Sequence, residues 1–230
     1  MTIPMTKTLI QTRSNRLQDS IDYYLRLGFE VIADSSPTIV SDGKAFIEIS
    51  ESPYVRPGLI IYKSDFISIV SELNKLTNVQ NHTDGHLITD GSGTWIYLTE
   101  KEFECDLQAK AESTSLLGNY MGICIETIDL SKSAKIFEIL GFKQSTPEWP
   151  SFSDENGFTI TLFEPYNCPH LFFNPSLTYF NGKENLKVIE KIRTLNIPIT
   201  EEITHFNEQG IVDNIVLRDP SGLGFLVFND

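Results

Sequence analysis

An internal repeat constrains the fold of this chain more than any other feature of its sequence. Ser20 and Gly28 recur as Ser133 and Gly141, in both cases 113 positions later. Each copy carries an aromatic residue between them and has Leu-Gly-Phe around its glycine, at 27–29 and at 140–142. A duplication at this distance predicts two similar modules of roughly 110 residues each.

The order of expected elements is also repeated within each half. Apolar residues at helical spacing end at a glycine, and short strand-like segments follow, separated by turn signals such as Asp-Gly. We expect an α+β fold of four βαβββ units, with one module at residues 1–100 and the second at 118–230. The charged segment 101–117 is expected to be a linker. In the second module we expect the fifth strand to begin at His170, with a long loop over 175–182.

Composition excludes several classes of partner. The net charge of −13 argues against a nucleic-acid partner, which requires basic patches. The three cysteines (Cys105, Cys124 and Cys168) are widely spaced and form no CxxC pair, which is typical of a reduced compartment. No signal-peptide core and no long apolar run occurs. We therefore expect a cytoplasmic protein without a membrane partner, either a monomer or a homodimer.

The second module carries a recognisable set of motifs. Asp129-Leu130 lies ahead of Ser133, Phe137 and Leu-Gly-Phe, and an Asp-Pro-Ser-Gly turn at 219–222 precedes the last expected strand. Together with the βαβββ order, these motifs resemble the vicinal oxygen chelate superfamily, which includes glyoxalase I, the extradiol dioxygenases and the bleomycin-resistance proteins. The resemblance covers nearly the whole chain and implies cupped sheets with a cavity on each concave face. Because this fold hosts many activities, function must be inferred from the cavity residues.

The resemblance also implies where a divalent metal would be held. Metal-binding members place ligands on the first, fifth and last strands of a module, leaving open positions for a chelating substrate. In the second module the first and last positions fall on Gly122 and Leu226, which cannot be ligands, and only His170 is retained. In the first module the positions fall on Leu9, Gly58 and Tyr97. We therefore expect no metal and no other cofactor.

Strand alternation predicts which side chains line each cavity. In the second module the set is Cys124, Glu126, His170, Phe172, Leu226 and Phe228. In the first module Leu9, Gln11, Arg13 and Tyr97 share a face. Arg13 either receives a carboxylate or phosphate from a ligand, or pairs with an acidic residue at the rim. Trp149, Tyr179 and Phe180 are candidates for a lid.

Two readings of the polar cavity residues stay open at this point. Glu126 and His170 could act as a general acid/base pair with Cys124 as nucleophile. Alternatively, His170 is a relic of a metal site, Glu126 lies in water at the rim, and Cys124 is a small core residue. The main hypothesis is a protein that binds a small apolar or amphipathic molecule without metal chemistry. The alternatives are a lyase- or dioxygenase-like enzyme with a displaced metal site around His170, and an interaction module whose pocket has closed.

Overall fold

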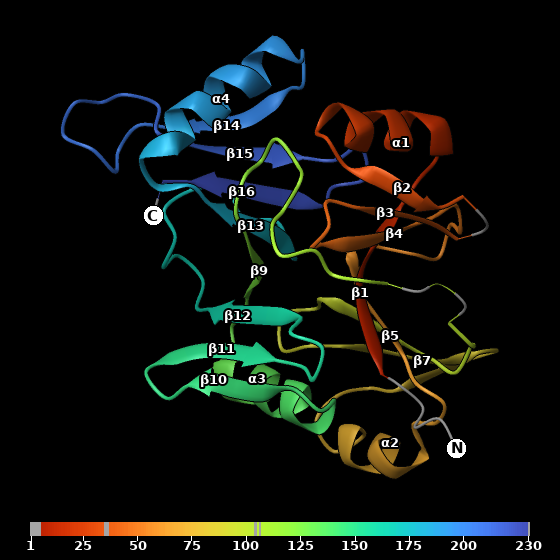
Figure 1. Ribbon diagram of the computed structural model, residues 1–230. Coiled ribbons are helices and arrows are strands. Elements are labelled where there is room, and N and C mark those ends of the chain that lie inside the picture. Colours follow the sequence, from red (N-terminus) through yellow and green to blue (C-terminus); the bar gives the residue numbers. More distant parts are fainter. Residues whose placement is uncertain (1–5, 35–36, 104, 106, 230) are drawn as a thin grey trace.

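The computed structural model describes residues 6–34, 37–103, 105 and 107–229, and its strands form two eight-stranded sheets, one from each half of the sequence (Figure 1). The first sheet has the order β2-β3-β4-β1-β5-β8-β7-β6. Its elements are β1 (Lys7–Arg13), α1 (Leu17–Arg26), β2 (Glu30–Ala33), β3 (Thr38–Ser41), β4 (Phe46–Ser50), β5 (Gly58–Tyr62), α2 (Ile67–Leu73), β6 (Gln80–His82), β7 (Gly85–Thr89) and β8 (Trp95–Thr99).

The second sheet repeats this order as β10-β11-β12-β9-β13-β16-β15-β14. Its elements are β9 (Tyr120–Glu126), α3 (Leu130–Ile139), β10 (Lys143–Thr146), β11 (Trp149–Ser153), β12 (Thr159–Phe163), β13 (Ser176–Phe180), the short 3-10 helix η1 (Gly182–Glu184), α4 (Asn185–Thr194), β14 (Ile199–Ile203), β15 (Asn214–Arg218) and β16 (Gly224–Phe228). The prediction of an α+β fold with two fused modules of βαβββ units is confirmed.

Local sequence explains where the helices begin and end. Asp129 caps α3, because its side chain accepts a hydrogen bond of 3.0 Å from the Lys132 N–H. Beyond α3 the chain turns at Gly141, whose φ of +100° favours glycine. Gly28 ends the α1 segment in the same way, with a φ of +85°. The repeated Leu-Gly-Phe motif is therefore a repeated helix stop.

The helix-bearing faces of the two modules pack against each other. One large hydrophobic core contains buried side chains from both sheets and from all four α-helices of the described chain, so the modules share their main core. Tyr24 of α1, for example, contacts Phe225 of β16, with their ring centroids 6.2 Å apart. Each concave face has its own smaller apolar cluster. We refer to these faces as the first and second cups.

Buried carboxyl groups in the turns connect the modules. Asp219, in the turn before β16, accepts hydrogen bonds from the hydroxyls of Thr12 (2.8 Å) and Tyr24 (3.0 Å) in the first module. Asp42, in the turn before β4, accepts one of 2.9 Å from the Tyr179 hydroxyl of the second module. Because buried polar groups need partners, these bonds fix how the modules are arranged.

The fifth strand of the second module lies later than the sequence prediction placed it. Residues 170–174 are not a strand, and β13 occupies the region expected to be a long loop. The prediction failed because Pro175 was interpreted as part of a loop, whereas it lies directly before the strand, where its missing N–H costs no ladder bond. Tyr179 is consequently not a lid residue: it is fully buried in the shared core.

The expected linker is attached to the first module along its described part. The Lys110 and Thr114 N–H groups donate to the carbonyls of Gly43 (2.6 Å) and Asp42 (2.7 Å), and Leu117 is fully buried. This segment therefore takes part in the shared core as well as connecting the modules. No helix in the described part of the chain is long and apolar enough to cross a membrane.

Candidate functional site

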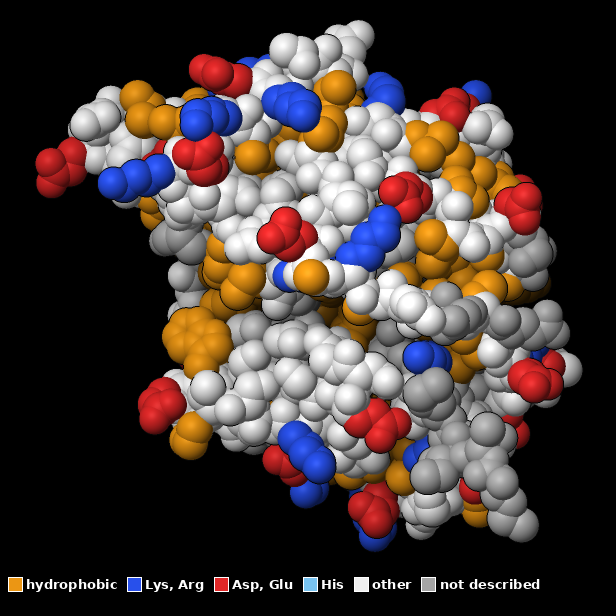
Figure 2. Space-filling view, in the orientation of Figure 1, with side chains coloured by type: hydrophobic (Ala, Val, Ile, Leu, Met, Phe, Trp, Pro, Cys, Tyr) orange, Lys and Arg blue, Asp and Glu red, His pale blue; other side chains and the backbone are white. Residues whose placement is uncertain are grey.

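The second cup holds a pocket of about 260 Å³ with a mostly aromatic wall. Figure 2 shows hydrophobic side chains gathered in a hollow at the left edge of the visible face. Five of the residues predicted for this cavity line the pocket: Cys124, His170, Phe172, Leu226 and Phe228. The remaining wall comes from Trp149, Phe163, Asn167, Cys168, Pro169, Thr178, Phe180 and Phe206. Of the proposed lid residues, Trp149 and Phe180 therefore lie at the pocket, and Trp149 is 53% exposed.

The structure does not assemble Glu126 and His170 into a proton-transfer pair. The His170 ring stacks on Phe172 and meets the Phe228 ring edge-on, with centroids 4.9 Å apart. Its Nδ1 lies 2.9 Å from the Leu171 carbonyl oxygen. Glu126 is not part of the pocket wall, and its backbone N–H and carbonyl bond to the side-chain amide of Asn174 at 2.8 and 2.9 Å. No hydrogen bond or ion pair joins these two described side chains.

Cys124 lines the pocket as a neutral thiol. It is buried, and its Sγ is 2.9 Å from the Thr178 hydroxyl. Burial raises the pKa of the Cys124 thiol to about 12. Since the thiolate is the reactive form, this cysteine is not activated as a nucleophile.

The metal positions implied by the superfamily do not carry ligands here. Register across β9, β13 and β16 aligns Gly122, Thr178 and Leu226 in one row. The fifth-strand position is therefore Thr178, and the expectation that His170 occupies it is wrong, since His170 lies in the preceding loop. The same row in the first module holds Leu9, Ile60 and Tyr97, so the expectation that Gly58 occupies the fifth-strand position is also wrong. Across the described residues, no group of three or more His, Cys, Asp or Glu side chains is placed to hold a metal ion. These residues do not fit a metal.

The first cup is more polar than the second. It holds a pocket of about 370 Å³, and Tyr97 lines it with its hydroxyl bonded to the Tyr54 carbonyl at 2.7 Å. Arg13 is not part of this wall: it is half-buried, and its Nε lacks a hydrogen-bond partner. The structure thus does not show Arg13 as the anion-binding group of this pocket.

Sequence reasoning missed a carboxyl network in the first cup. Glu48 is 4% exposed and accepts hydrogen bonds from the Gln11 amide (3.1 Å) and the Tyr62 hydroxyl (2.5 Å). The available signal was the position of Glu48 between Ile47 and Ile49 in an alternating strand, which places it on the concave face. Burial raises the pKa of Glu48 above its ordinary value, and the two hydrogen bonds only partly oppose this.

The raised pKa of Glu48 predicts a pH-dependent effect of the Glu48→Gln substitution. The folded state holds this proton more tightly than the unfolded chain, so stability from Glu48 is complete below its ordinary pKa near 4.5 and is lost as the pH rises through the folded-state pKa. Glutamine has no such proton to lose. We expect the Tm of Glu48→Gln minus that of the wild type to increase between about pH 4 and about pH 8. Thermal melts of both proteins across this pH range test the prediction. A Tm difference that does not change with pH contradicts it.

Comparison with known proteins identifies the fold. Neither models of known families nor curated protein sequences match this chain. Among solved structures, the Mn(II)-bound glyoxalase from Novosphingobium aromaticivorans aligns with a TM-score of 0.56 at 10% identity, over 97% of this chain and 82% of that protein. An extradiol ring-cleaving dioxygenase from B. fuscum aligns with a TM-score of 0.55 at 13% identity, over 96% of this chain and 70% of that protein.

A halotolerant catechol dioxygenase aligns similarly, with a TM-score of 0.51 at 11% identity, over 95% of this chain and 84% of that protein. Together with the two repeated sheets, these similarities show that the chain has the vicinal oxygen chelate fold in two fused modules. Similarity at this level of identity establishes the fold and no activity.

Proposed function

We propose that this chain binds a small apolar or amphipathic molecule in the second cup, without metal chemistry. The observation that supports this most directly is the aromatic pocket on the concave face, whose wall includes Thr178 and Leu226, two residues at the ligand positions that cannot replace a metal-binding histidine or glutamate. Such pockets, apolar with few polar groups, are typical of small-molecule sites. The polar groups available to orient a ligand are His170, Thr178 and Asn167.

The geometry of the wall favours a planar ligand. The Trp149 and Phe163 rings meet edge to face at 5.9 Å, and Phe172 continues the wall at 6.4 Å from Phe163. Flat ligands gain from offset stacking and edge contacts with such rings. The volume of about 260 Å³ is below the roughly 300–1,000 Å³ of drug-sized sites, so we infer a ligand of one or two rings.

Replacing Trp149 tests the proposal. We expect 1-naphthol to bind the wild type at one site per chain and Trp149→Ala to bind at least about tenfold more weakly, because the mutant loses one exposed face of the wall. Tyr166→Ala is the matched control, since Tyr166 is also a surface aromatic, 94% exposed, and does not line the pocket. Calorimetry measures the affinity of 1-naphthol for the wild type and for each of the two variants. Equal binding by Trp149→Ala and wild type would count against a ligand in the second cup.

A further inference from the structure

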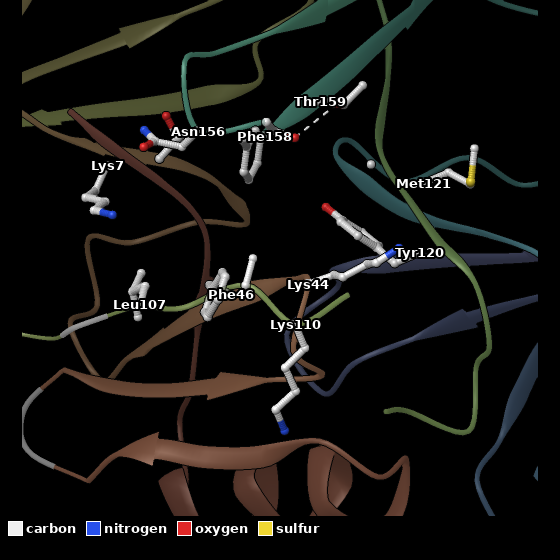
Figure 3. A pocket seen from close by; sticks show the side chains of 14 residues that line it. Lys7, Lys44, Phe46, Leu107, Lys110, Tyr120, Met121, Asn156, Phe158 and Thr159 are labelled. Carbon is white, nitrogen blue, oxygen red and sulfur yellow. Dashed lines mark hydrogen bonds between the residues drawn. The ribbon is translucent and has the colours of Figure 1, made fainter. Parts of the chain in front are cut away.

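A separate cleft of about 330 Å³ has walls from both modules and shares no wall residue with the pocket of the second cup. Figure 3 shows labelled side chains surrounding it from the β1 and β4 region, from the 101–117 segment, and from the β9 and β12 region. The wall consists of Lys7, Thr8, Lys44, Phe46, Leu107, Ala109, Lys110, Tyr120, Met121, Gly122, Asn156, Gly157, Phe158 and Thr159. Both copies of the repeat therefore contribute to one site that neither has alone.

The charge of this cleft is opposite to that of the protein. The chain has 31 acidic and 18 basic residues, yet the wall contains three lysines and no Asp or Glu. Lys110 directs its ammonium to Glu30 at 3.0 Å, so its contribution is mainly its aliphatic stem. Lys7 and Lys44 are half-buried and form no ion pair with any described acidic residue. Two lysines of the wall that have no ion pair with a described acidic residue favour an anion.

Two buried hydroxyls in the same wall lack partners. Thr8 is 8% exposed, and neither its Oγ1 nor the hydroxyl oxygen of Tyr120 has a hydrogen-bond partner. Buried polar atoms are almost always paired in native proteins, with protein atoms or with ordered molecules. Both residues line the cleft, and Figure 3 shows the Tyr120 side chain directed into it, so a bound molecule with acceptor oxygens can reach that hydroxyl.

The remaining wall is apolar and includes rings from both modules. Phe46 of β4 and Phe158, next to β12, are both half-buried, and Figure 3 shows their rings directed into the space between the modules. Leu107 and Met121 extend this apolar surface. The cleft therefore combines an apolar part with a cationic, hydrogen-bonding part, as expected for an amphipathic anion.

We infer that this cleft is a binding site for a small aromatic carboxylate. The positive charge that Lys7 and Lys44 give to the wall attracts the carboxylate, the Tyr120 hydroxyl donates a hydrogen bond to it, and the ring packs against Phe46 and Phe158. The site is distinct from the second cup, which has no lysine or arginine in its wall. Because its wall comes from both modules, ligand binding also stabilises their contact.

Calorimetric titration of the full chain with indole-3-acetate tests this inference. Tryptophol, the neutral alcohol with the same ring, and inorganic phosphate, an anion without a ring, are the comparison probes. We expect saturable binding of indole-3-acetate, at least about tenfold tighter than either comparison probe, because only it uses both parts of the cleft. Lys7→Gln and Lys44→Gln are each expected to weaken it severalfold, and the double variant about tenfold or more. Lys135→Gln, which removes the same charge from the exposed face of α3, should have no effect.

The outcome separates this site from the second cup. Trp149→Ala should leave indole-3-acetate affinity unchanged, and the lysine variants should leave 1-naphthol affinity unchanged. The inference is overturned if indole-3-acetate does not bind, if tryptophol binds equally well, or if the lysine variants bind as the Lys135→Gln control does. Loss of indole-3-acetate binding in Trp149→Ala alone would place that ligand in the second cup instead.

Discussion

Replacing Asp219 with alanine is expected to lower the free energy of unfolding by about 3–5 kcal/mol, because hydrogen bonds to a buried carboxylate contribute strongly and leave unpaired donors when lost. Its Oδ1 accepts from the N–H groups of Ser221 and Leu223, both at 2.8 Å. Its Oδ2 accepts from the Thr12 and Tyr24 hydroxyls across the module contact. Burial raises the pKa of Asp219, so the cost of burying its charge offsets part of this benefit at neutral pH. Chemical denaturation measures the change.

The second module offers a matched control in Asp154. This residue holds its own turn in the same way, accepting from the N–H groups of Asn156 and Phe158 at 2.9 Å, but its Oδ2 has no partner. Asp154→Ala therefore removes the turn bonds without any bond across the modules, and we expect a loss of about 1–2 kcal/mol. Equal losses in the two variants would show that the bonds of Asp219 to Thr12 and Tyr24 do not stabilise the module contact.

Gly122→Ala is the second substitution with a large expected effect, a loss of about 2–4 kcal/mol from backbone strain and overpacking together. Gly122 has a φ of +132°, and an added Cβ would lie 2.7 Å from the backbone oxygen of Thr159. Since that oxygen belongs to the adjacent strand β12, it cannot move aside as a flexible side chain can. Denaturation curves compare the variant with wild type.

Gly93→Ala separates the two causes. Gly93 also has a positive φ, +91°, but an added Cβ there has no atom within 4 Å, so only the conformational cost of about 1 kcal/mol is expected. If both glycine variants lose the same stability, the close approach to Thr159 is not restrictive. If the larger loss at Gly122 is found, no side chain, including a metal-binding histidine, can be restored at this position without a cost in stability.

The repeat made the architecture predictable. Helix stops at Gly28 and Gly141 and the turn signals set the order of the elements, and period-two alternation correctly separated Cys124 from Ile123 and Ile125, which face the shared core. Alternation is a local property of a strand, and it therefore worked wherever the strand itself was correctly identified.

The loop before β13 shows where this reasoning fails. The run from His170 to Phe173 is as apolar as a strand, and only its tertiary contacts show that it is a loop that folds over the second cup. Phe206, far along the chain in another loop, joins the same wall, and no periodicity predicts such a contact. The sequence pattern therefore does not predict which loop side chains line the second cup.

The two cups carry different side chains at equivalent positions of the repeated sheet. At equivalent places in the sheets, the first module pairs Gln11 with Glu48 and the second pairs Cys124 with Thr161. The first cup therefore carries a buried carboxyl group, whereas the second is apolar and aromatic. The divergence supports different roles for two surfaces of common origin, which is why we place the proposed apolar ligand in the second.

The most direct test of the proposed function is the titration of 1-naphthol into chelator-stripped protein, repeated in the presence of Mn²⁺ and of Fe²⁺. Binding in a pocket without metal ligands predicts the same affinity in all three conditions. Binding that requires a metal, and that is lost in His170→Ala, would contradict the account and assign a metal site to the second cup.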